Sequence, residues 1–529
     1  MMRRDFPRRF WAWRDGALPA LFFFCLEAAA IHAGARRIGF IGDSWAILFH
    51  AAQGWREALG TPLGYHYIPL ASGWTRLLYL ILGDHEGLYT IVNIGELAVV
   101  GWLTFLLGRR LLGDSLPGLL AGSLLIGSAA FPDITYWTLV GNFHCLAAAF
   151  AIGAIAAAAA LAEEAPPRGA SWGFAAALAG ACFTYEAMIT VLPVAIVWCL
   201  VRTAERTGVR SLFRLDPLKG LLLRFAPSLP VVAALILAKI RFSHATSIAT
   251  APGLDFERLH SLALSLVGIF SLRSSNDVLE TLLSLGPLMG IGRTRVLVFL
   301  GLALALGVWT FLRARRGAAL LVLWLAIHLG AAVVAIPLSP RHRFLPSIPG
   351  LLLLSFAFCR AGEGLARRLS RNPGAGAEAL NSAAAPPVPS TSANMAFAVP
   401  LVLASVLVLS AQGELHRAQE LYRRSFDALS LVVQRAKTLL PSRNTPATIT
   451  VVNAPGYMVE GGIAVPAFDN AVYGLVRHRL GGVKVELVHT RIGVQGGGAA
   501  GGSRLIDDQE LLARTADPFH AVVPFQLDP

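Results

Sequence analysis

Charged residues are scarce in this chain. They make up 15% of its 529 residues, while 55% are hydrophobic and the mean hydropathy is +0.60. Roughly a quarter of the residues of a soluble globular domain are charged, so this composition excludes an ordinary water-soluble protein. Apolar runs close to the ~20 residues needed to span hydrocarbon recur along most of the sequence. The composition therefore predicts an all-α polytopic membrane protein.

Acidic residues are outnumbered, with 32 Asp and Glu against 45 Lys and Arg and a net charge of +13. The excess arginines cluster between apolar runs, for example at 3–9, 202–214 and 360–371. This placement orients a membrane protein with its basic loops in the cytoplasm. No basic groove with interleaved aromatic residues stands out, so we expect no nucleic-acid partner.

Cysteine is also rare. The five cysteines lie in apolar segments and show no CxxC or His-rich spacing. This pattern argues against a disulfide framework or a thiolate metal site, and it favours small buried side chains.

About eleven apolar runs are predicted to span the membrane, from the length of each run and the position of the arginine clusters between them. Residues 258–291 are either two further spans or two helices on the outer surface, and neither choice changes the side of the later loops. The predicted spans lie near 17–35, 88–108, 115–131, 138–162, 172–185, 187–201, 222–241, 296–312, 318–337, 344–360 and 396–412.

The chain divides into four predicted parts. Residues 1–370 form a transmembrane domain with a long external loop at 36–87. Residues 371–395 are a Pro/Ala/Ser-rich linker that cannot bury a core. The last span, 396–412, is followed by a polar segment, 413–529, in which "ATITVVNAP" and "GGVKVELVHT" read as strands. We expect this segment to be a small α/β domain on the outer, periplasmic side of the cell membrane.

Three features converge on the outer face of this topology. Asp43 follows the first span, and Glu186 lies at the junction of two short spans. Arg341 and Arg343 flank His342 in an external loop, where two guanidinium groups are suited to hold a phosphate bidentately. A carboxylate there is placed to take a proton from an acceptor hydroxyl. The residues thus suggest chemistry on a lipid-linked phosphate.

Several weak motifs between about residues 17 and 360 occur in the order found in the GT-C superfamily of membrane glycosyltransferases. The chain resembles the protein O-mannosyltransferase-like branch, family 39, in particular. The motifs are Asp43 after the first span, "YIPL" at 67–70, Gly83, "LYTIVN" ending at Asn93, Arg109 and Arg110, "FPDITYW" at 131–137, "FTYEAMITVLP" around Glu186 and "RHRFLPSIPGLLLL" from Arg341.

The resemblance implies an inverting glycosyltransferase that moves a sugar from a polyprenyl-phosphate-linked donor to a glycan, lipid or protein acceptor on the outer face. Membrane lipids would surround it. The implied site residues are the catalytic carboxylate Asp43, the donor phosphate ligands Arg341, Arg343 and His342, and the substrate-orienting residues Glu186, Asp133, Tyr136 and His66.

The sequence departs from the family at three motif positions. The acidic pair is reduced to Asp43 and Ser44, Ile68 stands where the family often has arginine, and Thr90 replaces a histidine. We expect no cofactor, and with one carboxylate left a divalent metal stays an open alternative with little support.

Two other functions stay open. One is a transporter or flippase of a lipid-linked or polymeric substrate, although the paired broken helices typical of transporters are not visible. The other is an inactive scaffold that keeps the fold. For Asp43 the alternative role is capping the helix that begins near Trp45. For Arg341 and Arg343 it is anchoring to anionic headgroups.

Overall fold

A computed structural model describes most of the chain. The described residues are 16–41, 44–62, 66–209, 215–242, 256–273, 298–311 without 299, 306, 309 and 310, then 316–335, 340–370, 391–439, 448–452, 457–460, 463–466, 484–489, 504–505, 507–516 and 520–524.

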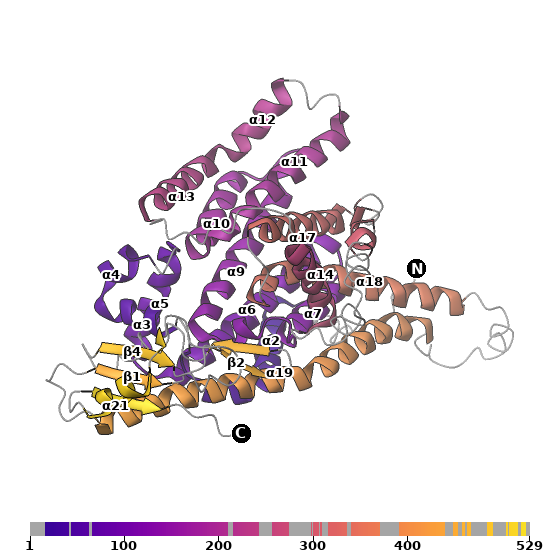
Figure 1. Ribbon diagram of the computed structural model, residues 1–529. Coiled ribbons are helices and arrows are strands. Elements are labelled where there is room, and N and C mark those ends of the chain that lie inside the picture. Colours follow the sequence, from indigo (N-terminus) through magenta and orange to yellow (C-terminus); the bar gives the residue numbers. More distant parts are fainter. Residues whose placement is uncertain are drawn as a thin grey trace.

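The described part is dominated by helices (Figure 1). Their bounds are α2 (Ala17–Ile31), η1 (Ala33–Arg37), α3 (Ser44–Gln53), α4 (Trp55–Gly60), α5 (Pro69–Leu82), α6 (Glu86–Leu112), α7 (Ser115–Ile126), α8 (Pro132–Tyr136), α9 (Thr138–Leu161), α10 (Ala170–Thr184), η2 (Glu186–Thr190), α11 (Val191–Thr207), α12 (Leu215–Phe225), η4 (Ala226–Ser228), α13 (Leu229–Phe242), α14 (Phe256–Ser271), α17 (Arg316–Ala335), η5 (Pro340–Arg343), α18 (Phe344–Ser370), α19 (Thr391–Leu439) and α21 (Asp508–Ala516).

Seven helical segments of the described residues are long and apolar enough to cross a membrane, and the chain is a multi-pass membrane protein. Four shorter apolar helices, of 10–17 residues each, accompany them. The predicted total of about eleven spans stays a prediction, because the run at 296–312 lies partly outside the described residues. In the ambiguous stretch 258–291, α14 is described and residues 274–291 are not.

Helices α6 and α7 pack closely against each other. Gly113, in the left-handed conformation with φ 72°, ends α6, and the side chain of Asp114 caps α7 by accepting a hydrogen bond from the Leu116 amide at 3.1 Å. A Cβ atom on Gly118 would lie 2.5 Å from the Phe105 carbonyl oxygen. Small residues let two membrane helices approach this closely. The resulting van der Waals contacts stabilise the pair in lipid, where no hydrophobic effect drives helices together.

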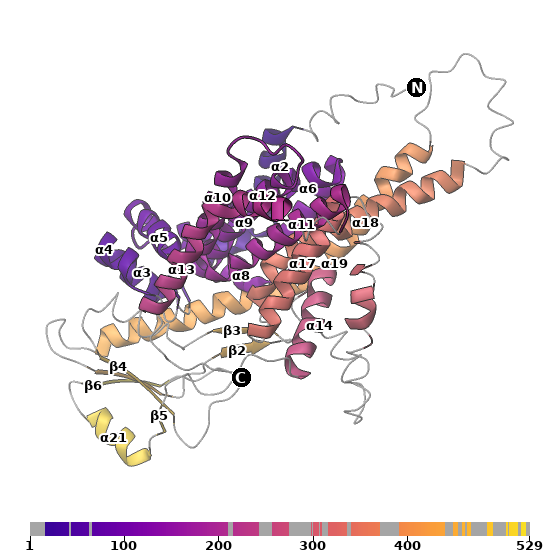
Figure 2. The same ribbon diagram turned by 90° about the horizontal axis from the view of Figure 1, so that it is seen from above.

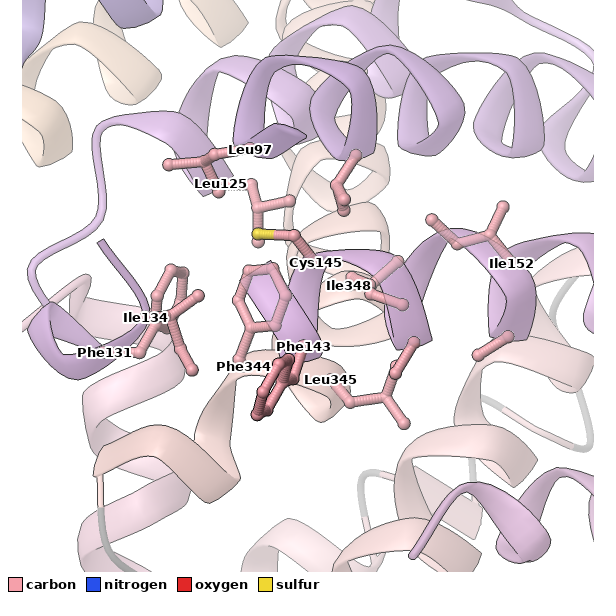
Figure 3. Close-up of a cluster of buried hydrophobic side chains, with 14 of the residues drawn as sticks. Leu97, Leu125, Phe131, Ile134, Phe143, Cys145, Ile152, Phe344, Leu345 and Ile348 are labelled. Carbon is pink, nitrogen blue, oxygen red and sulfur yellow. The ribbon is translucent and has the colours of Figure 1, made fainter. Parts of the chain in front are cut away.

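The core lies where α6, α7, α8, α9 and α18 meet (Figure 3). Phe131, just before α8, packs edge-to-face on Phe344 at the start of α18, with ring centroids 5.0 Å apart. Among the five cysteines, four are buried as predicted, whereas Cys25 on α2 is exposed. This packing fixes the first turn of α18, and with it the residues of η5 that precede it.

The predicted first external loop contains three helices, α3, α4 and α5, that pack on each other, and α3 and α5 also contact α9. Leu80 and Ile81 of α5 are exposed, which is the amphipathic pattern of a helix lying in the membrane interface. The guanidinium of Arg76 donates to the carbonyls of Ala51 and Ala52, at 2.9 and 3.2 Å, and so caps the end of α3. Arg76 is thus a structural residue of this loop.

Helix α19 is much longer than the predicted last span. It continues from Thr391 to Leu439, so residues 413–439, predicted to belong to the C-terminal α/β domain, are helical. Ion pairs of Arg423 with Glu420 and Asp427, at 2.6 and 2.9 Å, support its polar half. Figures 1 and 2 show α19 running along the whole bundle towards the strands at its far end.

The strands beyond α19 include both predicted ones. Strands β1 (Thr448–Val452) and β4 (Lys484–His489) pair in parallel within a four-stranded sheet of order β5-β4-β1-β6. The remaining bounds are β2 (Tyr457–Glu460), β3 (Ile463–Pro466), β5 (Arg504–Leu505) and β6 (His520–Pro524). Helix α21 packs on the sheet through Leu511, which contacts Val452. The external α/β domain as a unit, and its side of the membrane, stay predictions.

Candidate functional site

Asp43, the predicted catalytic carboxylate, lies outside the described residues. Ile41 and Ser44, the described residues on either side, are both buried, and Ser44 begins α3. The role of Asp43 therefore stays a prediction.

A cavity of about 270 Å³ lies between α9, η2, α17, η5 and α18. One wall is apolar and includes Ala331, Ala332 and Leu345. Polar side chains from four elements and the residue before η2 complete it. They are His144, Tyr185, Thr190, His328, Arg341 and His342. The predicted phosphate ligands Arg341 and His342 thus share a cavity with residues up to about two hundred positions earlier.

Glu186 stands between two lining residues of this cavity, Tyr185 and Ala187, and it pairs with His66. Nδ1 of His66 lies 3.0 Å from a carboxylate oxygen of Glu186, and both side chains are partly exposed, by 31% and 23%. Tyr185 packs between two imidazoles, with ring centroids 6.0 Å from His66 and 4.8 Å from His144. The structure therefore brings His66, of the predicted first external loop, to the η2 turn, and two predicted substrate-orienting residues lie side by side.

Arg341 and Arg343 lie in different surroundings. The Arg341 guanidinium stacks 5.6 Å from the ring centroid of the largely buried Trp137, a cation–π contact that orients it beside the cavity. Arg343 is only 5% exposed and is not among the lining residues described for the cavity. The carboxylates that act on its charge are Asp133 and Glu414. A two-arginine phosphate clamp stays a prediction, with Arg341 the member at the cavity.

Asp133 belongs to a buried network behind the cavity. The Tyr422 hydroxyl of α19 donates a hydrogen bond of 2.5 Å to its carboxylate, the short distance expected for a charge-assisted bond. Burial raises the pKa of Asp133, and the bond from Tyr422 and the charges of Arg341 and Arg343 oppose that rise. Asp133 thus links α19 to the arginines of η5.

Tyr136 is buried on the same short helix. Its hydroxyl lies 3.3 Å from Nδ1 of His32, and burial raises the pKa of Tyr136 above its usual range. The side-chain amide of Asn93 donates to the carbonyls of Ile134 and Thr135, at 2.8 and 3.0 Å, and so holds α8 on α6. Tyr136 and Asp133 are absent from the described lining of the cavity, and their role in orienting substrate stays a prediction.

Replacing Asp133 by alanine should lower the free energy of unfolding by about 3 kcal/mol, because it leaves Tyr422 without its acceptor and removes a carboxylate from the buried Arg343. The measurement is thermal unfolding of the purified protein in detergent. Asp133→Asn is the matched control, since its amide oxygen can still accept from Tyr422, and it should lose less. Equal stability of the alanine variant and the wild type would refute the structural role of this network.

The sequence analysis assigned no role to His144 and His328, which line the cavity. It missed Tyr422, which is 289 residues from its partner Asp133 and lay in the segment assigned to the α/β domain. The sequence signal that could have found it is the spacing of Leu415, Ala418 and Tyr422, which places them on one face of a helix; the structure buries all three. Among the residues that the structure describes, no group of three or more His, Cys, Asp and Glu could hold a metal ion.

No family model matches the chain, and no curated protein matches it in sequence. Two solved structures illustrate what its fold is similar to. ArnT from Cupriavidus metallidurans, bound to undecaprenyl phosphate, is 12% identical, with 95% of this chain and 89% of that chain covered and a TM-score of 0.45. The oligosaccharyltransferase of Archaeoglobus fulgidus, in the apo form, is 13% identical over 91% of this chain and 65% of that chain, with a TM-score of 0.46.

The structural neighbours are GT-C membrane glycosyltransferases. The chain spans about two thirds of the length of the oligosaccharyltransferase.

Proposed function

We propose that this protein is a glycosyltransferase of the cell membrane. It moves a sugar from a polyprenyl-phosphate-linked donor to a glycan, lipid or protein acceptor on the outer face. The observation that carries the proposal is a cavity lined by Arg341 and His342, and also by Tyr185 and Ala187, the residues on either side of Glu186, which pairs with His66. A cation and a neighbouring carboxylate–imidazole pair suit a reaction between an anionic donor and a hydroxyl acceptor.

Arg341 binds the donor phosphate in this proposal. When the bond between the anomeric carbon and the phosphate oxygen breaks, its electron pair stays on the phosphate, whose charge rises from −1 to −2. A guanidinium already stacked on Trp137 needs little reorganisation to stabilise this charge, and the stabilisation is larger in a partly enclosed cavity than in water. His342 lines the same wall and contributes to the phosphate site.

Asp43 acts as the base in this proposal. It takes the proton of the acceptor hydroxyl as the new bond forms at the face of the sugar opposite the phosphate, which inverts the anomeric centre. Glu186 and His66 orient the acceptor at the edge of the cavity. Asp133, Tyr136 and Arg343 support the site from behind, through the contacts of α8 with α19 and η5.

The test is turnover by the purified full chain in nanodiscs containing polyprenyl phosphates linked to single sugars. We expect release of polyprenyl phosphate, by transfer to added acceptors or by slow hydrolysis, and the products are measured by mass spectrometry. Movement of the lipid across the bilayer without its consumption would instead support a flippase. Neither turnover nor binding of any polyprenyl phosphate would leave the inactive scaffold. Lipid and glycan profiles of a deletion strain would then identify the natural donor.

A further inference from the structure

His144 of α9 presents a hydrogen-bond acceptor at the cavity. Its Nδ1 lies 2.8 Å from the Val140 carbonyl oxygen, which can only accept, so Nδ1 carries the proton. Its other nitrogen, Nε2, is buried and has no hydrogen-bond partner among the described residues. Nε2 of the neutral ring is therefore an acceptor without a donor, at a residue that lines the cavity.

His328 of α17 has the same tautomer. Its Nδ1 lies 2.7 Å from the Thr190 hydroxyl, and this hydroxyl donates its single proton to the Ala187 carbonyl at 3.1 Å. Nδ1 of His328 is therefore the donor in the bond between the two side chains. Its Nε2 is left as an acceptor, again on a buried residue that lines the cavity.

Both rings are neutral in the cavity. A protonated imidazole would add a buried positive charge to a cavity that the cation Arg341 already lines, and no Asp or Glu is among the lining residues in the part of the chain that the structure describes. Two acceptors at the cavity leave a hydrogen-bonding potential that a bound ligand with donor groups satisfies when it displaces water. Hydroxyl groups are such donors, and they carry no charge.

We propose that His144 and His328 accept hydrogen bonds from two hydroxyls of the transferred sugar and thereby determine donor specificity. The cavity then takes an uncharged, polyhydroxylated monosaccharide. A cationic amino sugar would meet the charge of Arg341, whereas the nearby Glu186 is not a lining residue and is already paired with His66. An anionic sugar would compete with the phosphate for the same arginine and would face two imidazole lone pairs. This inference rests on the proposed function, because it takes the cavity as the donor site.

The experiment measures binding of three kinds of lipid to the full chain in nanodiscs. They are unsubstituted polyprenyl phosphate, polyprenyl phosphate linked to glucose, galactose or mannose, and the same lipid linked to an amino sugar. We expect the wild type to bind at least one neutral hexose lipid more tightly than the unsubstituted and amino-sugar lipids. His144→Phe and His328→Phe should each weaken that hexose lipid about 10-fold, and binding of the unsubstituted lipid should stay within about twofold.

A matched control is His416→Phe, which makes the same substitution at an exposed position on α19. The unsubstituted lipid reports on folding, since it binds through Arg341. The inference is overturned if the wild type binds all the lipids with the same affinity or prefers the amino-sugar lipid. It is also overturned if both variants weaken binding of the unsubstituted lipid as much as binding of the hexose lipid. Loss of all lipid binding in the wild type itself would instead overturn the proposed function.

Discussion

Replacing Asp43 by asparagine is expected to lower the rate of sugar transfer by about 10²- to 10⁴-fold, the usual contribution of a general base. Asparagine keeps the size of the side chain and can still accept hydrogen bonds, but it cannot take a proton at neutral pH. The rate should be measured at saturating donor, so that the chemical step is compared. Binding of the donor should remain close to that of the wild type.

The same substitution separates the two roles open to Asp43. Asparagine is as good a helix N-cap as aspartate. If Asp43 only caps the helix that the structure begins at Ser44, then Asp43→Asn retains both activity and stability. Asp43→Ala removes both functions and should additionally lower the free energy of unfolding by about 1 kcal/mol. An asparagine variant as active as the wild type would therefore exclude the catalytic role.

Replacing Arg341 by glutamine is expected to lower transfer by about 10²- to 10³-fold, because it removes the one cation that lines the described cavity at the departing phosphate. Arg341→Lys should recover only part of this loss. Lysine keeps the charge but lacks the planar fork that binds two phosphate oxygens and stacks on Trp137. Both the transfer rate and the affinity for unsubstituted polyprenyl phosphate should be measured.

The matched control for Arg341 is Arg360→Gln, further along α18, where the arginine pairs with Glu363 at 2.9 Å. This pair is partly exposed, so its loss should change neither transfer nor stability appreciably. If Arg341 only anchors the protein to headgroups, both arginine variants should behave alike, and the phosphate assignment would fail.

Much of the helix pattern could be predicted from the sequence, because hydrocarbon as a solvent selects for apolar runs of a given length. The runs at 88–108 and 138–162 differ from α6 and α9 by only a few residues at each end. The course of α19 could not be predicted in this way. Its second half is polar on one side, and it is stabilised by contacts with α8, η1 and the strands, which hydropathy does not register.

The candidate site shows the same division. The sequence predicts that both arginines of "PRHR", Arg341 and Arg343, bind the donor phosphate, and it gives no reason to distinguish them. Only the start of α18 decides which of them reaches the cavity. Packing of Phe344 on Phe131 sets the direction of η5, so Arg343 is buried with Asp133 whereas Arg341 stacks beside the cavity.

The sequence by itself determined that this chain resides in a membrane, and it placed several polar groups next to apolar spans. Both are local properties, set by the length and composition of each segment against the surrounding solvent. The tertiary structure alone decided that His66 meets Glu186, that Tyr422 reaches Asp133, and that His144 shares a cavity with Arg341. These partners are separated by 120 to 289 positions, and only the packing of whole helices brings them together.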